Sequence, residues 1–213
     1  MCPVLNYTAL GDSITAGVGA YVRSNFTKHY AKMLQIHTRS PVHRKVNAKR
    51  GATSGELHHM LQSPSYQKNI LSAHLITITI GGNDLLQANR AFEKTRDPAI
   101  LEKAVNQYEQ HMRMIVETIE RLKGAPQTPY LIQLIGLYNP FPEIPYSAYW
   151  IQQFNQTLHS MSSQHIQYVD LQSIYGNYGK DVLFMNHIHP NARGHYLIAQ
   201  QLMDSLIDWQ KVS

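Results

Sequence analysis

Hydrophobic and polar positions follow two patterns along this chain. Short apolar runs rich in β-branched residues alternate with longer segments in which apolar residues recur at helical spacing. The first pattern predicts β-strands, and the second predicts amphipathic helices. Their regular alternation is typical of βαβ units, which build parallel sheets. The predicted strands are Val4–Leu10, a run within Val42–Ala48, Leu75–Ile80, Tyr130–Leu137 and Ile166–Val169.

Five helices are predicted to follow these strands. In the longest, the periodic apolar pattern ends at Gly124 and Pro126, two residue types that commonly close helices. We expect Ser54 to be the N-cap of the second helix, because a serine side chain can accept a hydrogen bond from the first turn. The predicted helices are Asn25–His37, Ser54–Gln62, Pro98–Lys123, Ser147–Ser162 and Ala192–Trp209.

A proline-rich segment follows the fourth predicted strand. Tyr138–Pro145 contains Pro140, Pro142 and Pro145, and prolines cannot lie inside a helix without breaking it. The segment is therefore predicted to be a loop. In sheets of this kind the carboxyl ends of the strands face the ligand crevice, so this loop is a candidate wall of a pocket.

Length and charge narrow the possible classes of protein. The chain has 213 residues, enough for one well-buried core, so we expect a single domain over residues 1–213. Its net charge is +5, but the basic residues are scattered, and nucleic-acid binding is not expected. The densest basic cluster favours a solvated strand edge and loop over a phosphate site; it comprises His43, Arg44, Lys45, Lys49 and Arg50.

Cysteine content and hydropathy bear on the compartment. Cys2 is the single cysteine, so no intramolecular disulfide can form, which fits a reducing compartment. No apolar run is long enough to predict a membrane span, and the N-terminus lacks the charged and apolar regions of a signal peptide. We therefore expect a cytoplasmic protein, although a chain whose leader had been removed would give the same pattern.

Two short motifs directly after predicted strands carry groups that can do chemistry. Gly11-Asp12-Ser13 places a hydroxyl at the carboxyl end of the first strand; taken alone, this tripeptide favours a turn. Gly81-Gly82-Asn83-Asp84 follows the third strand. The Asn83 side-chain amide could donate to a developing oxyanion, and the alternative interpretation is again a turn.

Two further positions join these motifs. Gly51 follows the second strand, where its backbone N–H could point into the same crevice. His189 lies in the run NHIHP before the last helix, and histidine is the usual base for a serine nucleophile because its pKa lies close to neutrality. Pro190 stiffens the chain after it, and Asn191 is expected to cap the helix that follows.

Together these four sites resemble those of the SGNH family of GDSL-type esterases and acylhydrolases, whose name lists Ser, Gly, Asn and His. Ser13 in GDSIT, Gly51, Asn83 in GGND and His189 in HP match the four blocks in order. The resemblance extends from Leu5 to Leu206. Supporting matches to bacterial lipase-like members are LYNPF at Leu137–Phe141 and VDL at Val169–Leu171, where Asp170 is expected to be structural.

The resemblance implies a fold and a mechanism. The implied fold is a flavodoxin-like three-layer α/β/α sandwich with a five-stranded parallel sheet. Ser13 would attack an acyl carbonyl, and His189 would accept its proton. The oxyanion hole would be the backbone N–H groups of Ser13 and Gly51 together with the Asn83 side chain. The implied substrate is a small ester or lipid-like molecule, with no metal or cofactor.

One position departs from the family pattern. The last block of the family usually reads DxxHP, and here Asn186 stands in place of the aspartate. An amide oxygen can accept the ring N–H and hold the tautomer, but it supplies no negative charge. Three accounts stay open: an active natural variant, a substitution made deliberately to weaken the enzyme, or a protein that has become a binder. Asp181 has the wrong spacing to replace the aspartate.

Other functions are weighed against a serine esterase. A binding protein would keep the pocket and lack turnover. A flavin or nucleotide binder fits the strand order, but the chain has no GxGxxG and no P-loop. The absence of GxSxG argues against an α/β-hydrolase. Apolar side chains beside the proline-rich loop could hold an acyl chain or simply pack; they are Phe141, Ile144, Tyr146, Tyr149 and Trp150.

Overall fold

The structure is a computed structural model that describes residues 4–20, 25–124, 129–185 and 187–212. It contains a five-stranded sheet in the order β2-β1-β3-β4-β5, with every neighbouring pair parallel. The strands are β1 Leu5–Gly11, β2 Val42–Ala48, β3 Leu75–Thr79, β4 Leu131–Ile135 and β5 Ile166–Val169. All five lie where the sequence predicts them.

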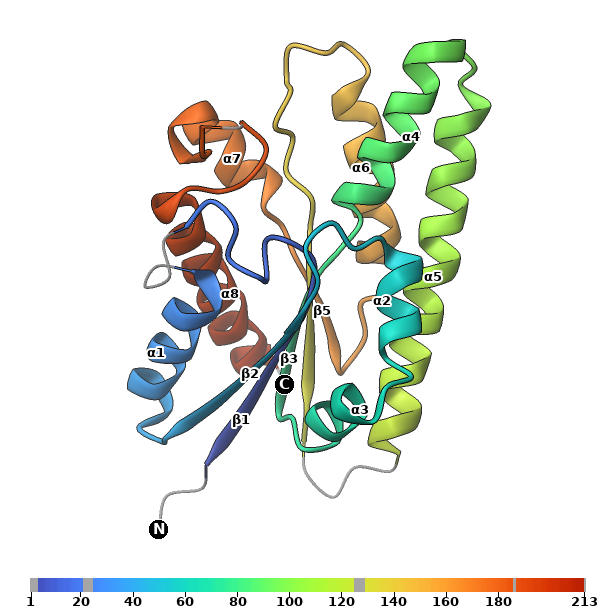
Figure 1. Ribbon diagram of the computed structural model, residues 1–213. Helices are drawn as coiled ribbons and strands as arrows, with labels where there is room; N and C mark the ends of the chain where they lie inside the picture. The colour runs from blue at the N-terminus through green and yellow to red at the C-terminus, as the bar shows by residue number, and fades with distance from the viewer. Residues whose placement is uncertain (1–3, 21–24, 125–128, 186, 213) are drawn as a thin grey trace.

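Helices cover both faces of this sheet (Figure 1). α1, α7 and α8 lie on one face, and α2 to α6 lie on the other. Each layer has its own buried apolar cluster against the sheet. The helices are α1 Phe26–Thr38, α2 Ser54–Met60, α3 Pro64–Leu71, α4 Gly82–Thr95, α5 Ala99–Lys123, α6 Ser147–Ser160, α7 Gln172–Tyr178 and α8 Ala192–Val212, with a 3-10 turn at Gly179–Val182.

The two layers explain why the central strands read as continuous apolar runs. Every residue of β3 and of β4 is buried, because a parallel strand covered on both faces has no solvent side. The predicted three-layer sandwich is confirmed. Within the described residues, none of the helices is both long and apolar enough to cross a membrane.

The helix prediction was incomplete. The sequence did not predict α3, α7 or the 3-10 turn. It also did not predict α4, which begins inside the motif Gly81-Gly82-Asn83-Asp84, where a turn or a loop carrying a hydrogen-bond donor was expected. Gly81 alone has the left-handed backbone, with φ 112°. Of the residues in α4, only Ala88 is buried, and the glycines at the start of the helix are typical of a turn.

The N-cap of α2 is also corrected. Ser54 was predicted to cap this helix, but Thr53 does so, as part of a capping box with Glu56. The Thr53 hydroxyl accepts from the Glu56 N–H at 3.3 Å, and the Glu56 carboxylate accepts from the Thr53 N–H at 3.0 Å. Ser54 is fully buried instead, which frees its hydroxyl for contacts with other helices.

The sheet order fixes where a ligand can bind. From β1 the chain moves outward to β2, whereas β3, β4 and β5 extend the sheet in the other direction. The carboxyl ends of β1 and β3 therefore lie side by side at the point where the strand order reverses. Loops that leave such a point diverge to opposite faces and open a crevice between them.

Candidate active site

Ser13 follows β1 directly at this crevice. Gly11 closes the strand with φ 147°, and a Cβ there would lie 2.2 Å from the Thr79 carbonyl oxygen, so only glycine fits. Asp12 is buried and accepts hydrogen bonds from the Ile14 N–H and the Thr79 hydroxyl, both at 3.0 Å. Burial raises the pKa of the Asp12 carboxyl to about 6. The turn after β1 is thus tied to β3, and Ser13 keeps 8% of its surface exposed.

His189 reaches Ser13 from the far end of the chain. Its Nε2 lies 2.9 Å from Ser13 Oγ, a hydrogen-bond distance. The segment that carries the ring is held by a β-bridge between Leu183 and Pro190 and by a hydrogen bond of 2.7 Å from the Phe184 N–H to the His189 carbonyl. Burial lowers the pKa of the His189 ring, and the nearby positive charge of Arg50 lowers it further.

A second histidine connects the chain that follows Ser13 to the helix that follows His189. His195 of α8 is fully buried, with its Nε2 3.1 Å from the Val18 carbonyl oxygen and its Nδ1 accepting from the Phe26 N–H at 3.3 Å. One ring therefore fixes the turn after Ser13 and the start of α1 to the helix that follows His189. As predicted, Asn191 caps that helix: its Oδ1 accepts from the Gly194 N–H at 3.0 Å.

Asn83 lies in the first turn of α4 and lines the same cavity as Ser13 and His189. Its Nδ2 donates to the Ala52 carbonyl at 2.8 Å, which leaves the second amide hydrogen directed elsewhere. Gly51 stands beside Ala52 with φ 77° and is not among the residues that line the cavity. Within the described ranges, the backbone N–H groups of Ser13 and Gly51 donate to no protein acceptor.

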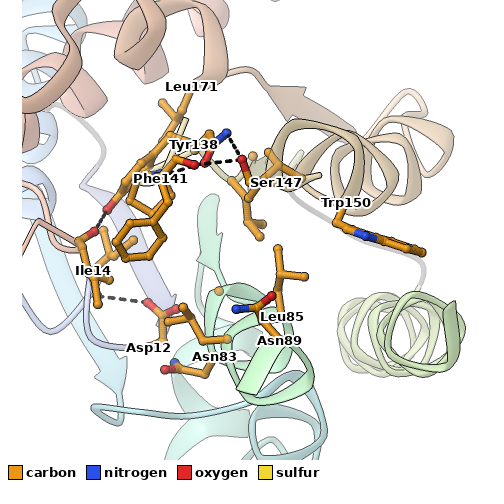
Figure 2. A pocket seen from close by; sticks show the side chains of 18 of the residues that line it. Asp12, Ile14, Asn83, Leu85, Asn89, Tyr138, Phe141, Ser147, Trp150 and Leu171 are labelled. Atoms are coloured by element: carbon orange, nitrogen blue, oxygen red, sulfur yellow. Dashed lines mark hydrogen bonds between the residues drawn. The ribbon is translucent and has the colours of Figure 1, made fainter. Parts of the chain in front are cut away.

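A cavity of about 270 Å³ opens beside these side chains. Figure 2 shows Tyr138 and Phe141 facing Asp12 and Asn83 across it, with Leu85 and Asn89 extending from α4. The predicted wall is thus confirmed: Tyr138, Asn139, Pro140 and Phe141 of the proline-rich loop line this cavity, as do Ile144, Tyr146 and Trp150, whereas Tyr149 does not.

The proline-rich loop is held at its start by contacts on both sides. Tyr138 donates to the Ile188 carbonyl at 2.5 Å, and its ring stacks on Tyr175 with 3.9 Å between centroids. Leu137 exchanges two hydrogen bonds with the Asn155 side chain of α6, at 2.7 and 2.8 Å. The same wall therefore borders the cavity and supports the chain just before His189.

Three acidic or amide positions need separate mention. Asn186 lies outside the residues that the structure describes. Asp170 accepts from the Gln172 N–H at 2.9 Å and ties the end of β5 to α7, a local structural contact. Asp181 lies in the 3-10 turn, where its carbonyl accepts from the Asn191 side chain at 2.8 Å.

The cavity wall formed by α4, including Leu85 and Asn89, was not expected from the sequence, because this helix was not predicted. The link between Ser54 and Asp84 was not expected either: the Asp84 carboxylate accepts a hydrogen bond from the Ser54 hydroxyl at 2.5 Å. Only the position of Asp84 directly after Asn83 could have pointed to a role near the site.

The chain was compared with known proteins. Residues 9–197 match the GDSL-like lipase/acylhydrolase family. The spore germination lipase LipC of Bacillus licheniformis is 34% identical over 200 residues, which cover 93% of this chain and 94% of LipC.

Two solved structures resemble the fold described above. The lipase Lip_vut3 from a goat rumen metagenome is 34% identical, with a TM-score of 0.91 and coverage of 94% of this chain and 97% of that one. The psychrotrophic esterase EstA from Pseudoalteromonas sp. shares the fold at 19% identity, with a TM-score of 0.67 and coverage of 97% and 98%. The family match over most of the sequence, supported by the relatives at 34% identity, shows that this chain belongs to the GDSL-like lipase/acylhydrolase family and is an ester hydrolase.

Proposed function

We propose that this enzyme cleaves carboxylic esters through an acyl intermediate on Ser13. The observation that carries the proposal is the distance of 2.9 Å between Ser13 Oγ and His189 Nε2. Ser13 Oγ attacks the carbonyl carbon while His189 Nε2 takes its proton. The tetrahedral intermediate then collapses, the alcohol leaves with that proton, and water, activated by His189 in turn, releases the acid.

The developing negative charge needs donors that are already in place. The Ser13 and Gly51 backbone N–H groups and the second Nδ2 hydrogen of Asn83 fill this role in the proposed mechanism. Support comes from the hydrogen bond between Asn83 and Ala52 at 2.8 Å, which orients the amide before substrate arrives. The same bond ties the helix of Asn83 to the segment of Gly51.

Asn186 takes the place of the usual aspartate in this proposal. We assign to its amide oxygen the role of accepting the Nδ1–H of His189, which would keep Nε2 as the base without adding the charge that stabilises the imidazolium. Turnover then depends on Ser13, His189 and the oxyanion donors. This is the first of the three accounts of Asn186, an active natural variant.

The first test is the assignment of the nucleophile. Ser13→Ala should abolish hydrolysis of a nitrophenyl butyrate, and an alkyl phosphonate should label Ser13 in the intact enzyme, as read by peptide mass spectrometry. Ser65→Ala, at an exposed serine of α3, serves as the control and should keep full activity. Folded enzyme that stays unlabelled, or retains activity as Ser13→Ala, would refute the mechanism.

The second test is the charge at position 186. Asn186→Asp should raise kcat, because a carboxylate stabilises the imidazolium that forms as Ser13 loses its proton. In a protease the reverse change lowers kcat by about 10⁴, which sets the upper bound of the expected gain. The kcat of both proteins on the same ester gives the answer. An unchanged or lower kcat for Asn186→Asp would show that the amide is already adapted to its role.

The third test is the pH profile. His189 must be neutral to act as base, so kcat/KM falls as the pH drops through its pKa. Burial and Arg50 lower that pKa, so activity should persist below the ordinary histidine value of about 6.5. Arg50→Gln removes the positive charge and should move the acidic limb to higher pH, most clearly at low salt. Arg113→Gln is the control, since Arg113 pairs with Glu109 on the exposed face of α5; equal profiles for all three proteins would contradict the assignment.

A further inference from the structure

α4 forms one wall of the cavity. This helix lines the cavity as far as Asn89 and Arg90 and then continues to Thr95. At that point the Tyr146 hydroxyl donates to Asn89 Oδ1 at 3.1 Å. The Phe92 ring packs edge-on against the Tyr146 ring, with 5.2 Å between centroids. A bridge of Asn89, Phe92 and Tyr146 thus joins the α4 wall of the cavity to the segment that follows the proline-rich loop.

The distance from the reacting atoms to this bridge limits what can fit. Asn89 follows Asn83 by six residues in α4, a rise of about 9 Å along an α-helix. With its carbonyl at Ser13 Oγ, an acyl chain would run along this helix past Leu85, and its far end would meet the bridge. Leu85 and Asn89 both extend from α4 toward the cavity (Figure 2).

The bridge is held in place from behind. The Asn89 amide also donates to Glu93 Oε1 at 3.1 Å, which directs its oxygen toward Tyr146. Ser147 fixes the loop at its end, since its hydroxyl lies within hydrogen-bond distance of the Phe141 and Ile144 carbonyls at 2.9 and 2.8 Å. A longer chain that follows this wall meets the Asn89–Tyr146 bond and the rings of Phe92 and Tyr146.

We propose that the bridge of Asn89, Phe92 and Tyr146 sets the acyl-chain length of this enzyme, restricting it to esters of short and medium straight-chain acids. This inference rests on the proposed function, because it places the acyl carbonyl at Ser13. It makes Tyr146 and Asn89 specificity-determining residues that take no part in bond breaking.

The test is kcat/KM for butyryl, octanoyl and dodecanoyl nitrophenyl esters. Tyr146→Ala should raise the ratio of dodecanoyl to butyryl kcat/KM by roughly tenfold, the low end of what one methylene is worth in an apolar pocket. Tyr146→Phe and Asn89→Ala, which break the hydrogen bond and disturb packing less, should give smaller shifts in the same direction. Tyr149→Ala, at an exposed neighbour, should leave the ratio unchanged.

The outcomes separate this inference from the proposed function. Wild-type enzyme that cleaves the butyryl ester, with the same chain-length ratio in every Tyr146 and Asn89 variant, would overturn the inference alone. Wild-type enzyme with no activity on any ester would overturn the proposed function and the inference with it.

Away from the cavity, the buried Ser54 forms a cluster with the half-buried Asp84 and His111. Ser54 Oγ lies 2.5 Å from Asp84 Oδ1 and 2.9 Å from His111 Nδ1 of α5, and the Ser54 N–H donates to both Asp84 oxygens at 3.1 and 2.9 Å. Ser54 is fully buried, so no substrate reaches its hydroxyl. At Gly55 a Cβ would lie 2.9 Å from the His111 ring, so glycine lets α5 approach this closely.

The cluster connects the two segments that carry the oxyanion donors. Asp84 follows Asn83 directly, and Ser54 follows Gly51 by three residues. The bond from Asn83 to the Ala52 carbonyl is a second link between the same two segments. We infer that Asp84 is a positioning residue, which acts through Ser54 to hold Gly51 and Asn83 in register. This inference too rests on the proposed function.

A double-mutant cycle tests it. Asp84→Asn should lower kcat about tenfold with little change in KM. This loss is smaller than the roughly 10²- to 10³-fold loss in kcat that follows deletion of one oxyanion donor. In an Asn83→Ala background, where the donor set is already incomplete, the same change should cost less than about twofold. Ser54→Ala should follow the same pattern, and Asp204→Asn, at an exposed site on α8, should do nothing.

Equal losses of kcat on Asp84→Asn in the wild-type and Asn83→Ala backgrounds would show that Asp84 is merely structural and would overturn the inference. So would an unchanged kcat for Asp84→Asn in an otherwise active enzyme. If Asp84→Asn fails to fold, the Ser54→Ala cycle decides the matter by the same comparison.

Discussion

The hydrogen bond between Ser13 Oγ and His189 Nε2 joins residues 176 positions apart. Much of the fold serves to position these two side chains. Ser13 is placed by β1, whose last residue must be glycine because the Thr79 carbonyl of β3 is so close. His189 is placed by a short segment before α8. His195 of that helix bonds to Val18, in the turn after Ser13, and to Phe26, at the start of α1. Packing of α8 against α1 therefore keeps both ends of the bond in register.

The cavity wall that contains Tyr138 also supports the hydrogen bond between Ser13 and His189. Tyr138 borders the cavity, stacks on Tyr175, and donates to the Ile188 carbonyl next to His189. A ligand that moved this wall would therefore also move the proposed base. Ligand binding and the position of the proposed base are in this way coupled through Tyr138.

Much of this could be predicted from the sequence, because the signals are local. β3 and β4 are buried at every residue, so they appear as nearly continuous apolar runs. Ser13, Asn83 and His189 lie in short motifs at strand or helix ends, and the order of these motifs along the chain is what suggests chemistry. α4 was missed because it begins in a Gly-Gly-Asn motif typical of a turn and buries only Ala88.

The remaining features depend on contacts that no local pattern records. Asn89 and Tyr146 are 57 positions apart, as are Ser54 and His111, and each pair meets only after the helices pack. Ser54 was predicted to be a cap because serine is a good N-cap residue, but its neighbour Thr53 caps the helix and the Ser54 hydroxyl bonds to the distant Asp84. Hydrogen bonds between distant side chains are therefore where the structure adds most to the sequence.

The central claim is that Ser13 carries the acyl group during turnover. Acid quenching of the enzyme during hydrolysis of an octanoyl ester, followed by peptide mass spectrometry, measures this directly. The account predicts an octanoyl adduct on the peptide that contains Ser13, absent from His189→Ala enzyme treated in the same way. An adduct on another residue, or turnover with no covalent adduct at Ser13 under conditions where deacylation limits the rate, would contradict it.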